Sequence, residues 1–501
     1  MFTNVYPTPG RPTFGVEVEF LIATLPEDAV DPIDATGLAP VLRTPKAPSI
    51  GAEGFNRRYI LDKVKEAICE CFSPSPKVRS TGGRGCYLDW QVDIDPSISE
   101  MVHSLPYTFM GVEIGSPIQF SSPNAFDVIS RAISAITSKY RCMVNLSCGL
   151  HVHVGLDQER LSLEQIRRIA SLSYAVEPFL FTLHDPLRRV NNYCKPLQDY
   201  SYLANKFANP NLKQDLEKDM RHARPDNFFT TYCQYLGAGR RHGEAPLSLR
   251  GENVKADHVA AFLKTRQPRH FEPFTQPGDS RRTVLLPEIP DELAPGVSTA
   301  AELVSPTIIP ARPARQRKIP RLKLPRYSLE ELVSMRLQFS QWGLSVPPDR
   351  LKQLNERGPG PSVSQATQII YSQPGSDYIS ELLSGHDRPA IAFHAYDCTA
   401  LTPYHVPRTI EFRLGEGSLD SEWIPTWAKI CVGIFKFALY SSPSEFTNVL
   451  EKCNKGMKEE GGYDVIDLLD DTGLFAEAVI AEKRLMANKE QWSLAFVESD
   501  L

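Results

Sequence analysis

The stretch GVEVEF at residues 15–20 alternates apolar and acidic side chains one by one. Successive side chains of a β-strand point to opposite faces of the sheet, so Glu17 and Glu19 share one face while the valines and Phe20 share the other. We therefore predict a strand over residues 14–22 with one face in the core. The other face carries two carboxylates.

Two later stretches repeat this pattern with other polar residues. GLHVHV at residues 149–154 pairs His151 with His153, and TIEFRL at residues 409–414 pairs Glu411 with Arg413. Each pair alone has a plain alternative: a charged edge strand, a structural histidine pair, or a surface salt bridge. A solvent-facing strand usually carries assorted Thr, Lys, Ser and Gln, whereas these three carry only Glu, His and Arg. Together they resemble a ligand shell.

Carboxylates gathered on one face repel one another unless cations lie between them. Divalent metal ions remove that repulsion. Because carboxylate oxygens outnumber well-placed imidazoles here, the ligand set favours Mg²⁺ or Mn²⁺ over zinc, which prefers histidine and thiolate.

The composition is that of a globular protein, with 501 residues, 42% hydrophobic residues and a net charge of −5. Nothing in this balance calls for a nucleic-acid partner. The 10 cysteines are scattered without the regular spacing of a disulfide framework, which favours a reducing compartment. The N-terminal residues lack an apolar stretch of signal-peptide length, and no stretch suits a membrane span. We expect a cytoplasmic protein without a membrane partner.

Several further helices and strands are predicted from the spacing of hydrophobic residues and from residues that start or end such elements. Two strand candidates, residues 86–94 and 109–119, should lie side by side because they follow each other closely in the chain. Ser122 followed by Pro123 has the form of a helix N-cap, and Ser162 with Gln165 that of a capping box. The predicted helices cover residues 59–71, 123–136, 163–183, 423–440 and 464–491.

The middle of the chain differs in composition. Residues 305–326 carry seven arginines and lysines and no acidic residue among many prolines. A core is not expected from such a segment, and we interpret it as part of a flexible surface insertion; an arm that binds RNA, a membrane or a protein partner is the alternative. The predicted division is an N-terminal catalytic part at 1–204, a proline-rich basic insertion at 205–390, and a C-terminal catalytic part with a helical tail at 391–501.

Five motifs, in this order along the chain, resemble the amidoligase family, which is similar to glutamine synthetase and γ-glutamylcysteine synthetase. They cover about residues 14–200 and 391–440. They are GVEVEF at 15–20; Trp90 with Asp93, Asp95 and SI at 97–98; GVEI at 111–114 with SP at 116–117; CGLHVHVG at 148–155; and TIEFR at 409–413 with EGSLD at 416–420. The resemblance implies an α+β fold like that of glutamine synthetase, a curved antiparallel sheet with the active site on its concave face and helices on the other.

The resemblance also implies roles for single residues. Glu17, His151 and Glu411 would hold the metal of the nucleotide phosphates, and Glu19 and Glu113 the metal on the amino-acid side, with Asp93 or Asp95 as a further ligand. His153 and Arg413 are implied near the nucleotide, with Arg413 neutralising the transferred phosphoryl group. The run LRRVNNYC at 187–194 implies substrate or phosphate contacts for Arg188 or Arg189 and for Asn191, and Glu416 joins the catalytic set.

The implied activity is that of an ATP- and Mg²⁺-dependent (or Mn²⁺-dependent) carboxylate–amine ligase. ATP would phosphorylate a carboxylate, and an amine would attack the acyl phosphate to form an amide. The acid and the amine, small molecules or peptides, cannot be identified from the sequence. Two alternatives stay open: a metal-dependent hydrolase that uses the two strand histidines with His184, His386, His394 or His405, and an inactive ligase-like scaffold that binds a protein through residues 305–326.

Overall fold

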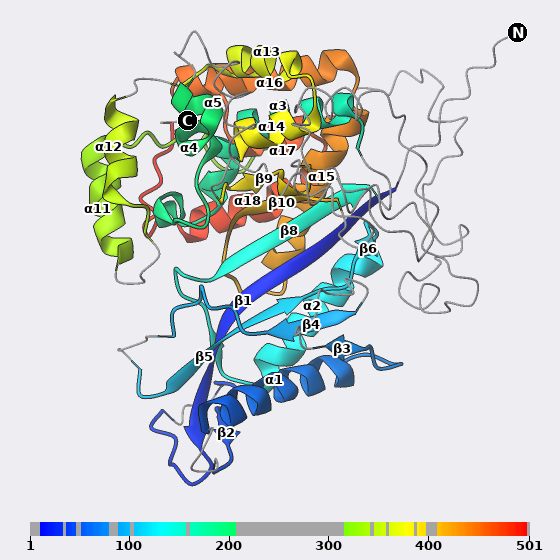
Figure 1. The fold of residues 1–501 in the computed structure, drawn as a ribbon, viewed down its shortest axis with the longest axis vertical. Coiled ribbons are helices and arrows are strands. Elements are labelled where there is room, and N and C mark those ends of the chain that lie inside the picture. The colour runs from blue at the N-terminus through cyan, green and yellow to red at the C-terminus, as the bar shows by residue number, and fades with distance from the viewer. Residues whose placement is uncertain are drawn as a thin grey trace, which may run out of the picture.

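The computed structural model describes residues 11–33, 37–46, 52–79, 89–100, 105–156, 161–206, 315–340, 345–356, 360–384, 388–396 and 408–497. In these residues the fold is a mixed α+β structure built on one large, open sheet (Figure 1). Its strands are ordered β3-β4-β5-β1-β8-β10-β9, and β2, β6 and β7 also pair with β1. Most neighbours are antiparallel; β2 with β1 and β3 with β4 are parallel.

The long strand β1 (Pro12–Pro26) lies at the centre of this sheet. It is flanked by β5 (Thr108–Gly115) and β8 (Gly149–Leu156), and β10 (Ile410–Glu416) follows β8. The shorter strands are β2 (Leu42–Thr44), β3 (Val78–Arg79), β4 (Trp90–Asp93), β6 (Gln119–Phe120), β7 (Cys142–Met143) and β9 (Ile391–Ala392). The predicted strand at 14–22 is confirmed, and the two candidates on either side of residue 100 do pair, as β4 with β5.

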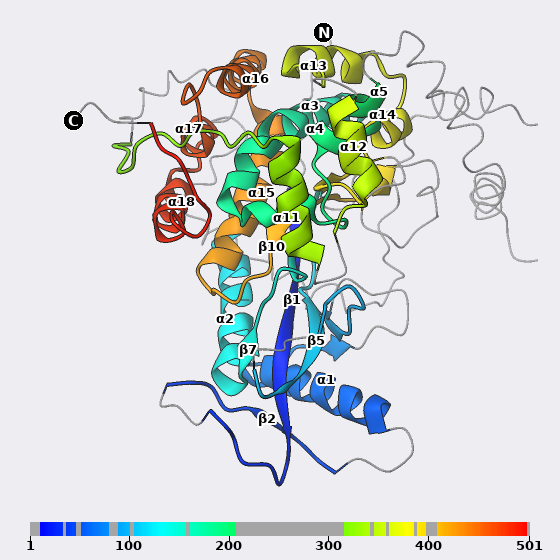
Figure 2. The ribbon, with the colours of Figure 1, turned by 90° about the vertical axis from the view of Figure 1, so that its left-hand side faces the viewer.

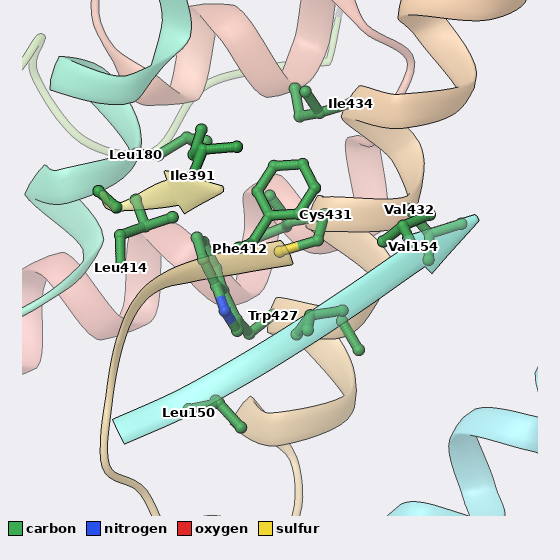
Figure 3. Packing of buried hydrophobic residues seen from close by; sticks show 14 of the residues in the cluster. Leu150, Val154, Leu180, Ile391, Phe412, Leu414, Trp427, Cys431, Val432 and Ile434 are labelled. Carbon is green, nitrogen blue, oxygen red and sulfur yellow. The ribbon is translucent and has the colours of Figure 1, made fainter. Parts of the chain in front are cut away.

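One face of the sheet is apolar because alternate residues of each strand are hydrophobic. Phe14, Val16, Val18 and Phe20 of β1 are all buried in the main core. Three helices cover this face: α1 (Ala52–Glu70), α2 (Pro123–Lys139) and α15 (Trp423–Tyr440). Figure 3 shows Trp427, Cys431 and Val432 of α15 against the apolar side chains of β8 and β10. The polar side chains of these strands therefore lie on the opposite face.

The remaining helices gather at one end of the molecule (Figures 1 and 2). Helix α3 (Leu163–Leu180) lies among them and packs on α15, and the capping box predicted at Ser162 is present. The others are η1 (Phe181–Leu183), η2 (Pro186–Val190), α4 (Leu197–Tyr200), α5 (Tyr202–Lys206), α11 (Leu329–Ser340), α12 (Pro348–Glu356), α13 (Val363–Ser372), α14 (Ser376–Leu383), η4 (His394–Tyr396), α16 (Pro443–Lys458), α17 (Val465–Asp471) and α18 (Phe475–Ala487). Among the described helices, none is both long enough and apolar enough to cross a membrane.

The described part of the predicted insertion is packed, not loose. Leu322, Ile370 and Ile379 are fully buried in the main core. Arg317 forms an ion pair with the buried Asp464 at the start of α17. Basic residues of the segment 315–326 thus pair with acidic residues of the C-terminal helices. This differs from the flexible segment that composition predicted there. Residues 305–314 of that segment lie outside the described ranges.

Candidate metal and catalytic site

The strand register brings the three polar pairs onto one face of the sheet. Glu17 of β1 lies directly opposite His151 of β8, and His153 lies opposite Glu411 of β10. On the other side of β1, Glu19 lies opposite Glu113 of β5. Directly opposed residues point to the same face, so segments almost 400 positions apart in the chain share one cluster of side chains.

The first group of possible ligands, called group 1 below, consists of Glu17, His151 and Glu411. One ligand atom from each lies within 4.8 Å of the other two. The Nδ1 atom of His151 is 3.3 Å from Oε2 of Glu17 and 3.9 Å from Oε1 of Glu411. His151 is almost fully buried, and its ring orientation is therefore fixed by its surroundings.

The second group, group 2, consists of Glu19, Asp95 and Glu113, again with ligand atoms within 4.8 Å of one another. Of the two aspartates considered from the sequence, Asp95 occupies this position, while Asp93 accepts the backbone N–H of Ile94 at 2.8 Å. Glu19 is held by the backbone N–H of Gly149, which donates to its Oε2 atom at 2.6 Å. Gly149 was missed as a site residue by sequence reasoning.

His151 lies between the two groups. Its Nε2 atom is 3.7 Å from Oε1 of Glu19, while its Nδ1 atom faces group 1. A histidine that binds a metal through one ring nitrogen commonly points the other toward a carboxylate, which fixes the ring orientation. Glu19 is placed to do this for His151.

The site is crowded with negative charge, and its pKa values reflect this. Burial raises the pKa of Glu113 to about 10, and the neighbouring Glu17, Glu19 and Asp95 add to the rise. Burial likewise raises the pKa of Glu19. Group 2 thus holds more carboxylates than it can keep ionised without a cation.

In group 1, neighbouring basic side chains have the opposite effect. Burial would raise the pKa of Glu17, but His153 and His151 hold it well below its usual value. Burial also opposes ionisation of Glu411, yet Arg413 and His153 lower its pKa. Although burial favours neutral His153, Glu17 and Glu411 raise its pKa to about 9.

Arg413 and His153 border group 1. The Nη1 atom of Arg413 donates to Oε1 of Glu411, and its Nε atom donates to the carbonyl of Tyr193 at 3.2 Å. The Nε2 atom of His153 lies 3.2 Å from Oε1 of Glu17. Both residues thus lie next to the group 1 carboxylates.

The four other residues with an implied site role belong to neither ligand group. Arg189 pairs with Asp199 at 2.9 Å, and Glu416 pairs with Arg484 and accepts the backbone N–H of Asp185 at 2.7 Å. Asn191 accepts the N–H of Tyr193 at 2.7 Å, which forms a local turn. Arg188 donates to two backbone carbonyls. Glu416, Asn191 and Arg188 thus contact backbone groups near the site, which their motifs did not reveal.

The remaining histidines bear on the hydrolase alternative. His184 is buried against Trp423 and Trp427, and its Nδ1 atom accepts the N–H of Glu416 at 3.4 Å. His394 lies in η4, and His386 and His405 fall outside the described ranges. Within those ranges, group 1 contains His151 as its one histidine and group 2 contains none.

Residues 11–232 match a family model described as "Putative amidoligase enzyme". This part of the chain is similar to the amidoligase family. No curated protein and no solved structure matches the chain. The amidoligase match includes β1, β5 and β8 with every residue of group 2, whereas Glu411 and Arg413 of β10 lie beyond its end. In the structure, β10 pairs with β8 of the matched region and contributes Glu411, which completes group 1.

Proposed function

We propose that this protein is an ATP- and Mg²⁺-dependent carboxylate–amine ligase with a catalytic fold like that of glutamine synthetase. The observation that carries the proposal is the pairing of two compact ligand groups, joined by His151 and bordered by Arg413. A single metal group with an H-x-H pair would fit many hydrolases. Two adjacent carboxylate-rich groups with an arginine suit the transfer of a phosphoryl group. The main task of catalysis in such a transfer is to stabilise the charge on the phosphoryl oxygens.

The donor set fits the metal that this function needs. The two groups together offer five carboxylates and one imidazole, a set typical of Mg²⁺ or Mn²⁺. Group 1 would hold the metal on the nucleotide phosphates, and group 2 the metal on the side of the acid substrate. When bound, such ions offset the charge of the phosphate oxygens and position them.

The chain's own residues would serve the two steps as follows. In the first, an oxygen of the substrate carboxylate attacks the γ-phosphorus of ATP, and ADP leaves. Arg413, held in orientation by Tyr193 and Glu411, would neutralise the transferring group, and His153 would contact the nucleotide. In the second, the amine nitrogen attacks the acyl carbon, phosphate leaves, and the nitrogen loses a proton.

The acid and the amine are substrates of open identity, small molecules or peptides. The proposal therefore rests on the phosphoryl chemistry, and the first test does not require the natural pair. Purified protein is incubated with ATP, Mg²⁺ and a panel of amino acids and amines. Phosphate release and amide products are followed by mass.

Variants link the expected activity to the site. Glu411→Gln removes a group 1 charge, and Arg413→Lys removes the planar guanidinium that contacts both Glu411 and Tyr193. We expect each to lower the rate by about 10²–10³, as for other groups that stabilise transition-state charge. Glu70→Gln, at an exposed carboxylate paired with Lys139, is the control and should keep full activity.

Unchanged ligation in both folded site variants would contradict the proposal. So would phosphate release that continues in the presence of excess chelator.

A further inference from the structure

The guanidinium of Arg188 is buried directly beside the two metal groups without entering either of them. Its side chain projects from η2 and is almost completely shielded from solvent. The Nη1 atom donates to the carbonyl of Cys148 at 3.2 Å, and the Nη2 atom donates to the carbonyl of Arg413 at 3.2 Å. One side chain thereby ties the start of β8 to the middle of β10.

The contact with β10 falls on an irregularity in the sheet. The register between β8 and β10 shifts by one residue between Phe412 and Gly415, so that Arg413 and Leu414 together stand opposite His151. A bulge of this kind takes one residue out of the regular ladder and redirects the side chains around it. Arg413 is one of the two residues at this bulge, and Arg188 supplies a donor for its carbonyl.

The backbone N–H of Arg413 is fixed from the other side, because it donates to the carbonyl of Ala390 beside β9 at 2.7 Å. Its backbone is thus held on both edges, by Ala390 and by Arg188. The side chain then reaches Tyr193 and Glu411. Arg188 therefore controls the backbone from which Arg413 reaches group 1.

Gly149 provides the space for this arrangement. A Cβ atom on Gly149 would lie 2.8 Å from Nη2 of Arg188 and 2.6 Å from Nε2 of His151. Only a glycine lets the guanidinium and the imidazole lie side by side over the first residue of β8. The N–H of the same glycine holds Glu19 of group 2, and the positive charge of Arg188 acts on that carboxylate.

We propose that Arg188 is a positioning residue that locks the β10 bulge and so sets the geometry of both metal groups. It acts on group 1 through the backbone of Arg413, and on group 2 through Gly149 and Glu19. This inference rests on the proposed function. It assigns Arg188 to the placement of the metal ligands and of Arg413, and not to contact with the substrate.

The test uses Mn²⁺ alone as the probe, with the full chain and without substrates. Arg188→Lys keeps the charge but loses the planar fork that bridges two carbonyls. Isothermal titration calorimetry should show Mn²⁺ binding weakened about 10- to 100-fold, the usual effect of removing a group that orients metal ligands. Hydrogen exchange of the 410–416 peptide should be faster than in the wild type.

A matched control variant is available in α3. Arg168 also donates to two backbone carbonyls, those of Ala438 at 2.6 Å and Ser441 at 2.7 Å, but it ties α3 to the end of α15. Arg168→Lys should leave Mn²⁺ affinity and exchange in the 410–416 peptide unchanged. Gly149→Ala is a second site variant, and it should reproduce the loss of affinity by displacing Arg188 and His151.

The outcomes separate this inference from the proposed function. If the wild type binds no Mn²⁺, the proposed function fails and the inference fails with it. If the wild type binds Mn²⁺ and Arg188→Lys binds it equally well, only the positioning role is overturned. An Arg188→Lys variant that does not fold would assign the residue to global stability and would also overturn it.

Kinetics with an active substrate pair give a further readout. A positioning role predicts a lower kcat with little change in the KM for the acid. A raised KM at unchanged kcat would instead mark Arg188 as a substrate contact and contradict the proposal.

Discussion

Glu113 illustrates how charge at single residues controls this site. Two carboxylates 4 Å apart repel each other by about 4 kcal/mol at an effective dielectric constant of about 20. Group 2 places Glu113 together with Glu19 and Asp95, so in the absence of a cation Glu113 retains a proton, as its raised pKa indicates. A divalent cation would take the place of that proton.

This leads to a prediction for Glu113→Gln. At pH 7 an amide resembles the protonated acid in shape and charge, so the metal-free variant should melt close to the wild-type temperature. It should bind one Mn²⁺ fewer in calorimetry, because group 2 loses a charged ligand while group 1 is intact. Glu66→Gln, at an exposed residue paired with Lys63, is the control. Wild-type stoichiometry in Glu113→Gln would contradict the assignment of group 2.

For single residues, the sequence predicts which side chains share a face of the sheet. It does not always predict which residue completes a ligand group. Strand alternation alone places Glu17 with Glu19 and His151 with His153. Asp95 lies just beyond the end of β4, where alternation no longer applies, so Asp93 and Asp95 could not be told apart. The engagement of Glu416 by Arg484 depends on a residue 68 positions away, which no local pattern reveals.

Among the elements, the extended segment at 315–326 departs furthest from expectation. Its own composition lacks acidic residues, which led to its interpretation as a solvated arm. The partners come from later helices: Arg315 pairs with Asp470 at 2.9 Å and with Glu482 at 3.0 Å, and Arg317 pairs with Asp464. Such long-range charge matching cannot be inferred from the segment itself. The β10 bulge is unpredictable for a similar reason, since it exists only relative to β8.

The stability of this segment is testable with Arg317→Met. Asp464 is buried and would lose its charged partner, which for buried pairs typically costs about 3–5 kcal/mol. Urea unfolding should show this loss in the free energy of unfolding. Arg321→Met is the control, because Arg321 is half exposed and its pair with Asp467 should contribute less than about 1 kcal/mol. Equal effects of the two variants would contradict the packed arrangement.

In the whole molecule, the sheet gathers site residues from four regions of the chain. β1 contributes Glu17 and Glu19, β8 contributes His151, and β10 contributes Glu411. Glu113 comes from β5, and Asp95 lies just beyond β4. The α+β class was implied by the family resemblance, and the pairing of β4 with β5 follows from local patterns. The placement of β10 beside β8 does not, because the segments between them in the chain give no indication of where it returns. We propose that this convergence creates two metal sites.

Anomalous diffraction from crystals grown with Mn²⁺ and a non-hydrolysable ATP analogue would locate the metal ions and the nucleotide directly. We predict one peak among Glu17, His151 and Glu411 and a second among Glu19, Asp95 and Glu113, with the analogue's phosphates beside the first. Nucleotide bound elsewhere, with no manganese at either group, would contradict that proposal.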